Sequence, residues 1–567
     1  MTPLDWGVFA LYFAGVLGLA WWQSRKNVGV EGYFLANRRM AWGAVGLSVM
    51  ATQASAITYI GTTGQAFDQG MGFIQVYLGL PIAMVFICAV FAPFFYKARL
   101  YTAYEYLEER FDARTRSLTS FLFLVSRGMA AGIVLYAPAI VLSVIFGWDE
   151  RMTILIMAVA TIAYTTMGGI TAVIWTDVVQ MGMMLAGIAI ALVVLFTQLP
   201  PELGFTDMVY VGGIQEKWKT IDLNPDPRET YTLWSGLIGG LFLALAYFGT
   251  DQSQVQRYLS ARSLKASRMA LIMNAFLKIP MQFFILGIGV LLFVFYHFEQ
   301  PPLIFNQAEV AAVEASARAE DYRVLEGEQG RVHTLRRDAA LALVEARHGG
   351  GDVEAFRTEV LRYDRELTAL REEAKGLVAE VRGAASNDVN YVFPSYLVEY
   401  VPAGLLGLLI AVIFAAAMSS LDSELTALSS ATVMDFYRRY FRKEASDAHY
   451  LTVARITTLF WGIYACMVAL YAGRLGSLVE AVNQIGSLFY GSLLGVFLLA
   501  FLVKSSNARG AFYGLIIGMA TVLAVSTFTP ISWLYYNVVG AFTVLAVGTL
   551  LSRNASEASS TGQSAPT

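Results

Sequence analysis

The sequence predicts an all-α integral membrane protein with about 13 transmembrane helices. First, 56% of its 567 residues are hydrophobic and only 15% are charged, whereas soluble proteins average roughly 25% charged residues. Second, apolar stretches of about 20 residues, the length needed to cross a bilayer as a helix, recur along the chain. Third, lysine and arginine are concentrated in alternate short loops, as is typical of cytoplasmic loops. Together these observations exclude a soluble multidomain protein.

The apolar stretches define the expected spans. They lie at roughly 4–22, 42–62, 71–96, 119–146, 152–168, 174–197, 232–250, 267–297, 402–421, 450–472, 478–503, 510–528 and 533–552. Two of them are expected to be interrupted. One set of short loops carries about 20 cations and the other about five, which predicts an inner (plasma) membrane protein with the N-terminus outside and the C-terminus cytoplasmic. The small polar tail, 553–567, is expected to be disordered.

Residues 303–385 differ from the rest of the chain because they are rich in glutamate and arginine. The triplet Gly349 to Gly351 divides them, and apolar residues after it alternate spacings of four and three, as in a heptad seam. We therefore expect an inserted extracytoplasmic helical hairpin. A solvated spacer is favoured over a docking arm for a protein partner. With two cysteines, four scattered histidines and no basic face, neither a disulfide framework, a metal site nor nucleic-acid binding is indicated.

Small and hydroxyl residues dominate the second span, from Ser48 to Thr58. Such a segment can unwind, and free backbone carbonyls are hard oxygen ligands for sodium. Close helix packing through small residues is an equal alternative. In the ninth span Ser419, Ser420 and Ser423 lie within about one turn, beside Asp422. Hydroxyls often bond to the preceding turn instead, but the two clusters together favour an ion site.

A third segment joins a Gly168-Gly169 hinge to an acid, Asp177, one to two turns into the following helix. Ionisable residues at membrane depth are costly and therefore functional candidates. An interfacial position with the carboxylate reaching water is the alternative for Asp177. No catalytic cluster is visible, so no enzyme activity is predicted.

Three motifs resemble the sodium:solute symporter family, which includes sodium/glucose, proline, sialic acid, iodide and monocarboxylate transporters. They are GGITAVIWTDVVQ (168–180), GTDQSQVQRYL (249–259) and AAAMSSLDSELTALSSATVMDFYRR (415–439). The resemblance implies a LeuT-type fold with two inverted five-helix repeats, each opening with a broken helix. The implied division is 1–41, an extra helix and loop; 42–197, the first repeat; 198–231, an extracytoplasmic loop; 232–302 and 386–503, the second repeat; 303–385, the hairpin; 504–552, two extra helices; and 553–567, the tail.

The same resemblance implies sodium as the coupling ion. Carried over by position, its ligands are Ala51, Ala54, Ala416, Ser419 and Ser420. A second sodium, held in some relatives, would use Asp177, Ser419, Asp422 and Ser423. Asp422 stands where some two-sodium members carry serine, so the stoichiometry stays open.

For the solute, the positions that bind sugar hydroxyls in relatives correspond here to Thr58, Tyr77 and Ala244, which disfavours a hexose. Arg127 suits a carboxylate, with Ser55 and Thr58 beside it as in the sialic acid transporters. A structural pair of Arg127 with an internal acid is an equal alternative. The expected solute-binding residues are Gln53, Ser55, Thr58, Phe73, Tyr77, Arg127, Tyr247 and Lys278.

The resulting hypothesis is a sodium-coupled symporter that imports a small organic solute, a carboxylate-bearing anion, by alternating access. Sodium/sugar or sodium/amino acid symport is the alternative, and a transporter-like membrane sensor is disfavoured. The expected partners are sodium, the solute and the lipid bilayer.

Overall fold

The computed structural model describes residues 1–25, 29–201, 203–386, 388–473 and 475–561 and contains no β-strand within them. The α-helices of the first half are α1 (Pro3–Ser24), α2 (Gly29–Leu35), α3 (Trp42–Gln53), α4 (Ala56–Gln69), α5 (Leu80–Phe86), α6 (Ala92–Ala98), α7 (Glu105–Arg110), α8 (Ala113–Phe146), α9 (Glu150–Gln198), α10 (Phe205–Ile214), α11 (Leu241–Thr250), α12 (Gln252–Leu259) and α13 (Leu264–Phe298). Those of the second half are α14 (Gln307–Glu314), α15 (Ala319–Gly349), α16 (Val353–Arg382), α17 (Val392–Tyr400), α18 (Leu405–Ala431), α19 (Asp447–Ala472), α20 (Leu478–Leu502), α21 (Ala508–Phe528) and α22 (Tyr536–Thr561). Short 3₁₀ or π segments are η1 (Ala36–Arg38), η2 (Met71–Tyr77), η3 (Ile87–Phe91), η4 (Ser235–Gly240), η5 (Val389–Tyr391), η6 (Thr432–Phe441) and η7 (Trp533–Tyr535).

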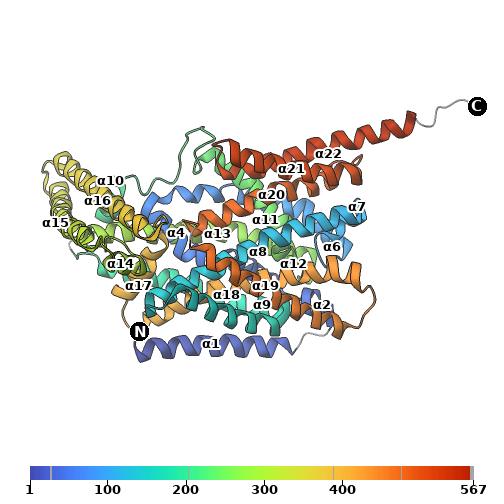
Figure 1. Cartoon of the computed structure of the whole chain (residues 1–567), viewed down its shortest axis with the longest axis horizontal. Helices are drawn as coiled ribbons and strands as arrows, with labels where there is room; N and C mark the ends of the chain where they lie inside the picture. The colour runs from blue at the N-terminus through green and yellow to red at the C-terminus, as the bar shows by residue number, and fades with distance from the viewer. Residues whose placement is uncertain (26–28, 202, 387, 474, 562–567) are drawn as a thin grey trace, which may run out of the picture.

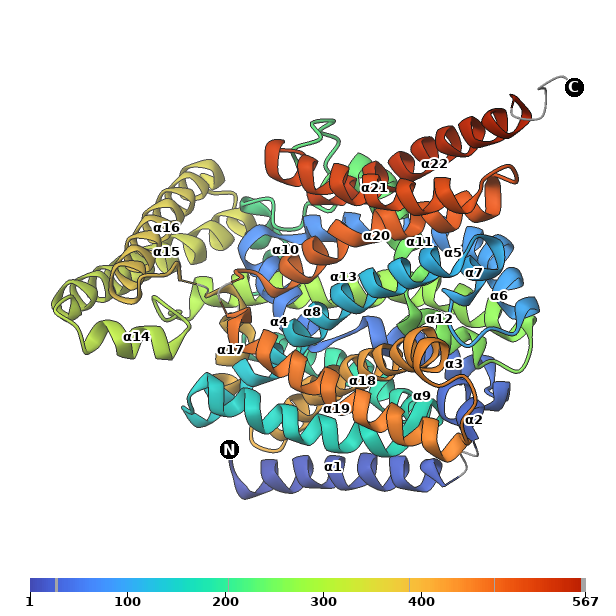
Figure 2. The same ribbon diagram turned by 45° about the vertical axis from the view of Figure 1, so that its right-hand side comes forward.

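The long helices form a bundle in which they run roughly alongside one another (Figure 1). Within the described residues, ten helices are long and apolar enough to cross a membrane, or up to eleven if a bent pair counts as one span. Ser235–Thr250 is a shorter apolar helix. The hairpin of α15 and α16 projects from one end of the bundle, on the side of the N-terminus, and the C-terminal end of α22 extends at the other (Figures 1 and 2).

Three interruptions divide the long helices. The axes of α3 and α4 differ by 52° across a break at Ala54 and Ser55. Asp251, in extended conformation, separates α11 from α12. Within α9, Gly169 has φ 59° and ψ 177°, a region that only glycine adopts readily. The broken helices α3–α4 and α11–α12 lie near the start of the two predicted repeats. The predicted Gly168-Gly169 hinge is confirmed at Gly169.

The inserted segment is a helical hairpin, as the heptad pattern predicts. Gly350, with φ 77°, ends α15, and Val360, Tyr363, Ala374 and Leu377 of the seam are buried in α16. The hairpin also contacts the end of α13. Arg336 donates to Asp364 at 3.0 Å and to the Tyr296 carbonyl at 2.5 Å. Polar contacts therefore anchor the hairpin on the bundle.

A histidine in this junction predicts how the hairpin responds to acid. His333 lies 3.2 Å from the Tyr296 carbonyl oxygen, and burial, aided by the charge of Arg336, lowers its pKa to about 4. Burial alone would raise the pKa of Asp364, but His297 and Arg336 lower it below its ordinary value. Asp364 therefore stays ionised over the pH range in which protonation of His333 favours the unfolded state.

Because an unfolded histidine has a pKa of about 6.5, the unfolded hairpin binds more protons than the docked one below that pH. Docking should weaken as the pH falls from about 6.5 towards 4. Amide exchange of residues 319–382 at pH 7.5 and pH 5 measures this. His333→Gln should remove much of the difference, and equal protection at both pH values would contradict the assignment.

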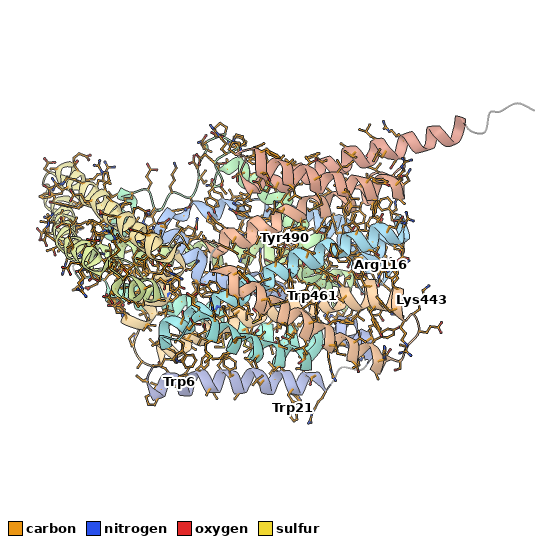
Figure 3. All side chains as sticks on the ribbon, viewed as in Figure 1. Trp6, Trp21, Arg116, Lys443, Trp461 and Tyr490 are labelled. Carbon is orange, nitrogen blue, oxygen red and sulfur yellow. The ribbon has the colours of Figure 1, made fainter. Side chains whose placement is uncertain are left out.

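The outer surface of the bundle carries large apolar side chains. Trp6 and Trp21 stand near the two ends of α1, 45% and 51% exposed (Figure 3). Amphipathic aromatic rings at this spacing are typical of membrane interfaces. Where a disordered tail is expected over 553–567, α22 continues to Thr561, and no glycine or proline occurs between Arg553 and Gly562 to end the helix earlier. Residues 562–567 lie outside the described part.

Candidate functional site

The first polar cluster joins the broken helix α3 to α18. Ser419 Oγ donates to the Ala51 carbonyl and to the Ala416 carbonyl, both at 3.1 Å. Ser420 Oγ donates to the Thr52 carbonyl at 2.9 Å and to that of Ala416 at 3.2 Å. Ser419 and Ser420 are buried, with 0% and 1% exposure. Two hydroxyls and three backbone carbonyls thus converge between the two helices.

Such a set of neutral oxygens suits a dehydrated alkali cation, because a hydroxyl can rotate its proton away and present a lone pair. Ala54 lies at the break itself, with φ −90° and ψ 69°, where its carbonyl leaves the helical ladder. The structure therefore brings together Ala51, Ala416, Ser419 and Ser420, with Ala54 at the adjoining break. Thr52 was not predicted, although its carbonyl contacts Ser420.

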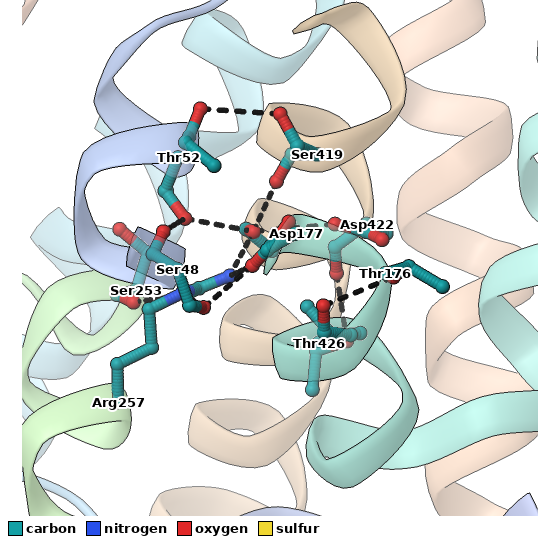
Figure 4. A network of polar contacts seen from close by, with 12 residues as sticks. Ser48, Thr52, Thr176, Asp177, Ser253, Arg257, Ser419, Asp422 and Thr426 are labelled. Atoms are coloured by element: carbon teal, nitrogen blue, oxygen red, sulfur yellow. Dashed lines mark hydrogen bonds and ion pairs between the residues drawn. The ribbon is translucent and has the colours of Figure 1, made fainter. Parts of the chain in front are cut away.

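A second polar network lies beside this cluster and is centred on a buried arginine (Figure 4). Arg257 of α12 donates through Nε to Ser48 Oγ at 2.9 Å and through Nη1 to the Ser253 carbonyl at 2.5 Å. Its Nη2 lies 3.4 Å from Asp177 Oδ2 and also donates to Ser423 Oγ. Arg257 and Asp177 are both fully buried. The guanidinium therefore contacts two residues of the predicted second sodium site.

The remaining members of that predicted site lie close by. Ser423 Oγ donates to Asp422 Oδ1 at 3.2 Å and to the Ser419 carbonyl, and Ser48 Oγ donates to Asp177 Oδ2 at 2.5 Å. Asp177, Ser419, Asp422 and Ser423 are thus neighbours, as the family resemblance implies. A second cation would share Asp177 and Ser423 with the guanidinium of Arg257.

A cavity of about 130 Å³ lies on the other side of Ser420. Residues of the α3–α4 break line it, together with side chains of η2, α8, α11, α18 and α20. Its polar and aromatic lining residues are Thr52, Gln53, Ser55, Thr58, Tyr77, Arg127, Tyr247, Phe248, Ser420, Glu424, Asn483 and Tyr490. Six of the eight predicted solute-binding residues line it: Gln53, Ser55, Thr58, Tyr77, Arg127 and Tyr247.

Arg127 is the positively charged residue that lines this cavity, and its guanidinium pairs with two acids. Its Nη1 donates to Glu424 Oε1 at 3.0 Å, and its Nη2 contacts Asp251 Oδ2 and the Tyr490 hydroxyl. The guanidinium also lies 5.2 Å from the centroid of the Tyr247 ring. The alternative of an internal ion pair for Arg127 is therefore realised, within a cavity that Arg127 also lines.

Phe73 and Lys278 do not line this cavity. Phe73 of η2 lines a separate cavity of about 280 Å³, with its ring 6.0 Å from that of Tyr77. The buried Lys278 Nζ lies 5.2 Å from the Tyr77 ring centroid. Both side chains lie close to Tyr77, which lines the central cavity, but neither is itself among the lining residues.

Several residues of the site were not predicted from the sequence. Glu424 and Arg257 lie within the recognised motifs, but nothing in the sequence shows what they face. Asp251 appears there only as part of a motif. Asn483 and Tyr490, on α20, carry no local pattern that separates them from ordinary helix residues. Only packing brings them to the cavity.

Two broken helices, an oxygen cluster of alkali-ion character and an adjoining polar cavity define a LeuT-type secondary transporter. The chain belongs to the sodium:solute symporter family, whose model matches residues 33–320 and 370–518. The family consists of sodium-coupled transporters and not of enzymes. The unmatched residues between the two ranges fall within the hairpin.

Individual relatives agree with this assignment. The chain is 27% identical to the sodium/sialic acid symporter SiaT of Proteus mirabilis, over 96% of this chain and 94% of that protein. It is 27% identical to human sodium-coupled monocarboxylate transporter 1, over 87% and 67%. A solved outward-open, substrate-bound sodium-coupled sialic acid symporter superimposes with a TM-score of 0.75 at 25% identity, covering 97% of this chain and 98% of that one.

Proposed function

We propose that this sodium symporter imports a small organic solute that bears a carboxylate. The observation that carries the proposal is the position of one cavity between the α3–α4 break, Arg127 and the Ser419–Ser420 oxygen cluster. Ser420 belongs to both the cluster and the cavity lining. An ion bound at the cluster is therefore adjacent to a solute bound in the cavity.

The carboxylate would bind at the start of α4. Ser55, the N-cap residue, makes no side-chain hydrogen bond to its own helix and lines the cavity. Thr58 lines it one turn later. Unpaired N–H groups and the dipole at a helix N-terminus favour an anion, and Arg127 lines the same cavity with an Nε donor that has no partner among the described residues. This solute agrees with the carboxylate-bearing substrate named for SiaT.

Transport would follow from the same contacts. Sodium bound by Ala51, Ala54, Ala416, Ser419 and Ser420 would join the broken helix to α18. Solute binding beside Ser420 would then favour closure of the outer side and opening of the inner side. The sodium gradient and the membrane potential, about 2.3 kcal/mol per charge per 100 mV, supply the driving force.

The orientation in the membrane is also a proposal. The hairpin and the N-terminus lie at one end of the bundle, and Lys443 lies near the other (Figure 3). The excess of cations at the latter end supports a cytoplasmic position for it, and exposed apolar residues such as Leu11 would face lipid. The hairpin would then face the exterior, where a solvated spacer and a docking arm for a protein partner are both compatible with its position.

The arrangement around Arg257 also bears on the number of sodium ions transported per cycle. Because Arg257 already supplies a cation to Asp177 and Ser423, we expect one sodium per cycle and a Hill coefficient of about 1 for sodium-dependent uptake. Uptake into proteoliposomes at varied sodium concentration measures it. A coefficient of about 2 would show that sodium displaces the guanidinium and fills the second site.

Proteoliposome uptake also tests the main proposal. Small carboxylates, sugars and amines are compared in sodium and in potassium media. Accumulation of carboxylate-bearing solutes in sodium alone is expected. Accumulation that is equal in both media would contradict the sodium coupling, and sodium-dependent accumulation of sugars alone would contradict the carboxylate.

A further inference from the structure

We propose that the transported solute carries a protonated amine as well as its carboxylate, and that Glu424 binds the amine. This inference rests on the proposed function and narrows its substrate class from organic anions to small zwitterions. Glu424 lies on α18, one turn beyond Ser420, and its side chain lines the central cavity with 4% exposure.

The first reason is an unused acceptor. Glu424 Oε1 accepts from Arg127, whereas Glu424 Oε2 is buried and has no hydrogen-bond partner among the described residues. Gln53 Oε1, from the α3–α4 break, is likewise a buried acceptor without a partner in that part of the chain. Unpaired buried acceptors are costly. A bound group with two or more N–H donors would satisfy both oxygens.

The second reason is the balance of charge. Arg127 contacts two carboxylates, Glu424 and Asp251. Asp251 is further satisfied by Ser253, whose backbone N–H and hydroxyl donate to Oδ1 at 2.9 and 2.6 Å. One guanidinium against two carboxylates leaves one negative charge, and of the two acids it is Glu424 that lines the cavity.

The neighbouring cations do not cancel that charge directly. Arg257 pairs with Asp177. Lys278 lies beyond Tyr77, 5.2 Å from its ring centroid, and does not line the cavity. A simple organic anion would add a second negative charge beside Glu424, whereas a zwitterion adds none. Its ammonium group would also face the Tyr77 and Tyr490 rings, which attract cations.

The third reason is the arrangement of complementary groups. The carboxylate site proposed above, at Ser55 and Thr58, borders the same cavity as Glu424. Arg127 Nε is a buried donor without a partner in the described structure, and Glu424 Oε2 on the other side chain of the pair is a buried acceptor without one. The volume of about 130 Å³ is below the roughly 300–1,000 Å³ of sites for drug-sized ligands. The solute should therefore be compact, with its two charges close together.

Three solutes that differ in one substituent test the inference: butanoate, 2-hydroxybutanoate and 2-aminobutanoate. Sodium-dependent thermal stabilisation of the purified full-length protein gives an affinity for each. We expect 2-aminobutanoate to bind at least about tenfold more tightly than butanoate, as for a hydrogen bond to a charged group. Butanoate or 2-hydroxybutanoate binding as tightly as the amine would overturn the inference.

The variant Glu424→Gln tests the residue. It should reduce the preference for 2-aminobutanoate over butanoate to about threefold or less, while sodium alone still stabilises the variant and thereby shows that it is folded. An unchanged preference would overturn the role of Glu424. Glu366→Gln, on the exposed face of α16, is the control and should keep the wild-type preference.

The outcomes separate this inference from the proposed function. Tight binding of butanoate with weak binding of the amine would leave the sodium–carboxylate symporter intact and reject the zwitterion. Sodium-independent binding of all three would reject the proposed function itself. Stabilisation by n-propylamine alone would reject the carboxylate and retain the role of Glu424.

Discussion

Replacing Ser419 and Ser420 together by alanine should abolish sodium-driven uptake. Each substitution removes one hydroxyl oxygen from the cluster with the Ala51, Thr52 and Ala416 carbonyls. Losing a hydrogen-bonding partner of a buried charge costs about 1–3 kcal/mol, so each alanine should weaken sodium binding roughly tenfold. Thermal stabilisation by sodium and uptake into proteoliposomes measure the loss.

A serine on the same helix is the matched control for this experiment. Ser429 donates to the Ala454 carbonyl at 2.8 Å and contacts Thr457, and it lies about three turns from the cluster. Ser429→Ala should leave the sodium dependence of uptake unchanged. If the double variant at 419 and 420 keeps the wild-type sodium dependence, the sodium site does not lie between α3 and α18.

Replacing Arg127 by glutamine should lower the free energy of unfolding by about 3–5 kcal/mol. The substitution removes the positive charge that Glu424 and Asp251 share. Breaking a buried ion pair leaves an uncompensated charge at low dielectric, which costs more than the pair contributes. Thermal unfolding in detergent measures this change, and loss of solute binding should accompany it.

A second substitution distinguishes charge imbalance from a packing defect. Adding Glu424→Gln to Arg127→Gln removes one unpaired acid and should recover a large part of the lost stability. Arg323→Gln is the control, because Arg323 pairs with Glu320 on the exposed hairpin surface, where ion pairs contribute about 0–1 kcal/mol. Equal destabilisation by the single and double variants would indicate that packing of the Arg127 side chain matters more than its charge.

Local composition predicted the α3–α4 break and an oxygen-rich cluster at Ser419 and Ser420, whereas the break at Asp251 and the individual sodium ligands followed only from the family resemblance. Small residues and hydroxyls from Ser48 to Thr58, and the serines after Ala417, depart from the branched apolar composition of a lipid-facing helix. The hinge was predicted from the pair Gly168-Gly169, and the structure gives Gly169 a positive φ that glycine adopts readily. The heptad spacing predicted the hairpin because it places apolar residues along one face of a helix, where a second helix can pack.

The sequence by itself determined the membrane class, the positions of the helices and the segments able to unwind, because hydrophobicity and residue size act over neighbouring positions. Only the tertiary structure decided which charges neutralise one another. Arg127 contacts acids that are 124 and 297 positions away in sequence, and Arg257 contacts Asp177 and Ser423 across three helices. The energy of a buried charge depends on its neighbours in space, and helix packing alone sets those neighbours.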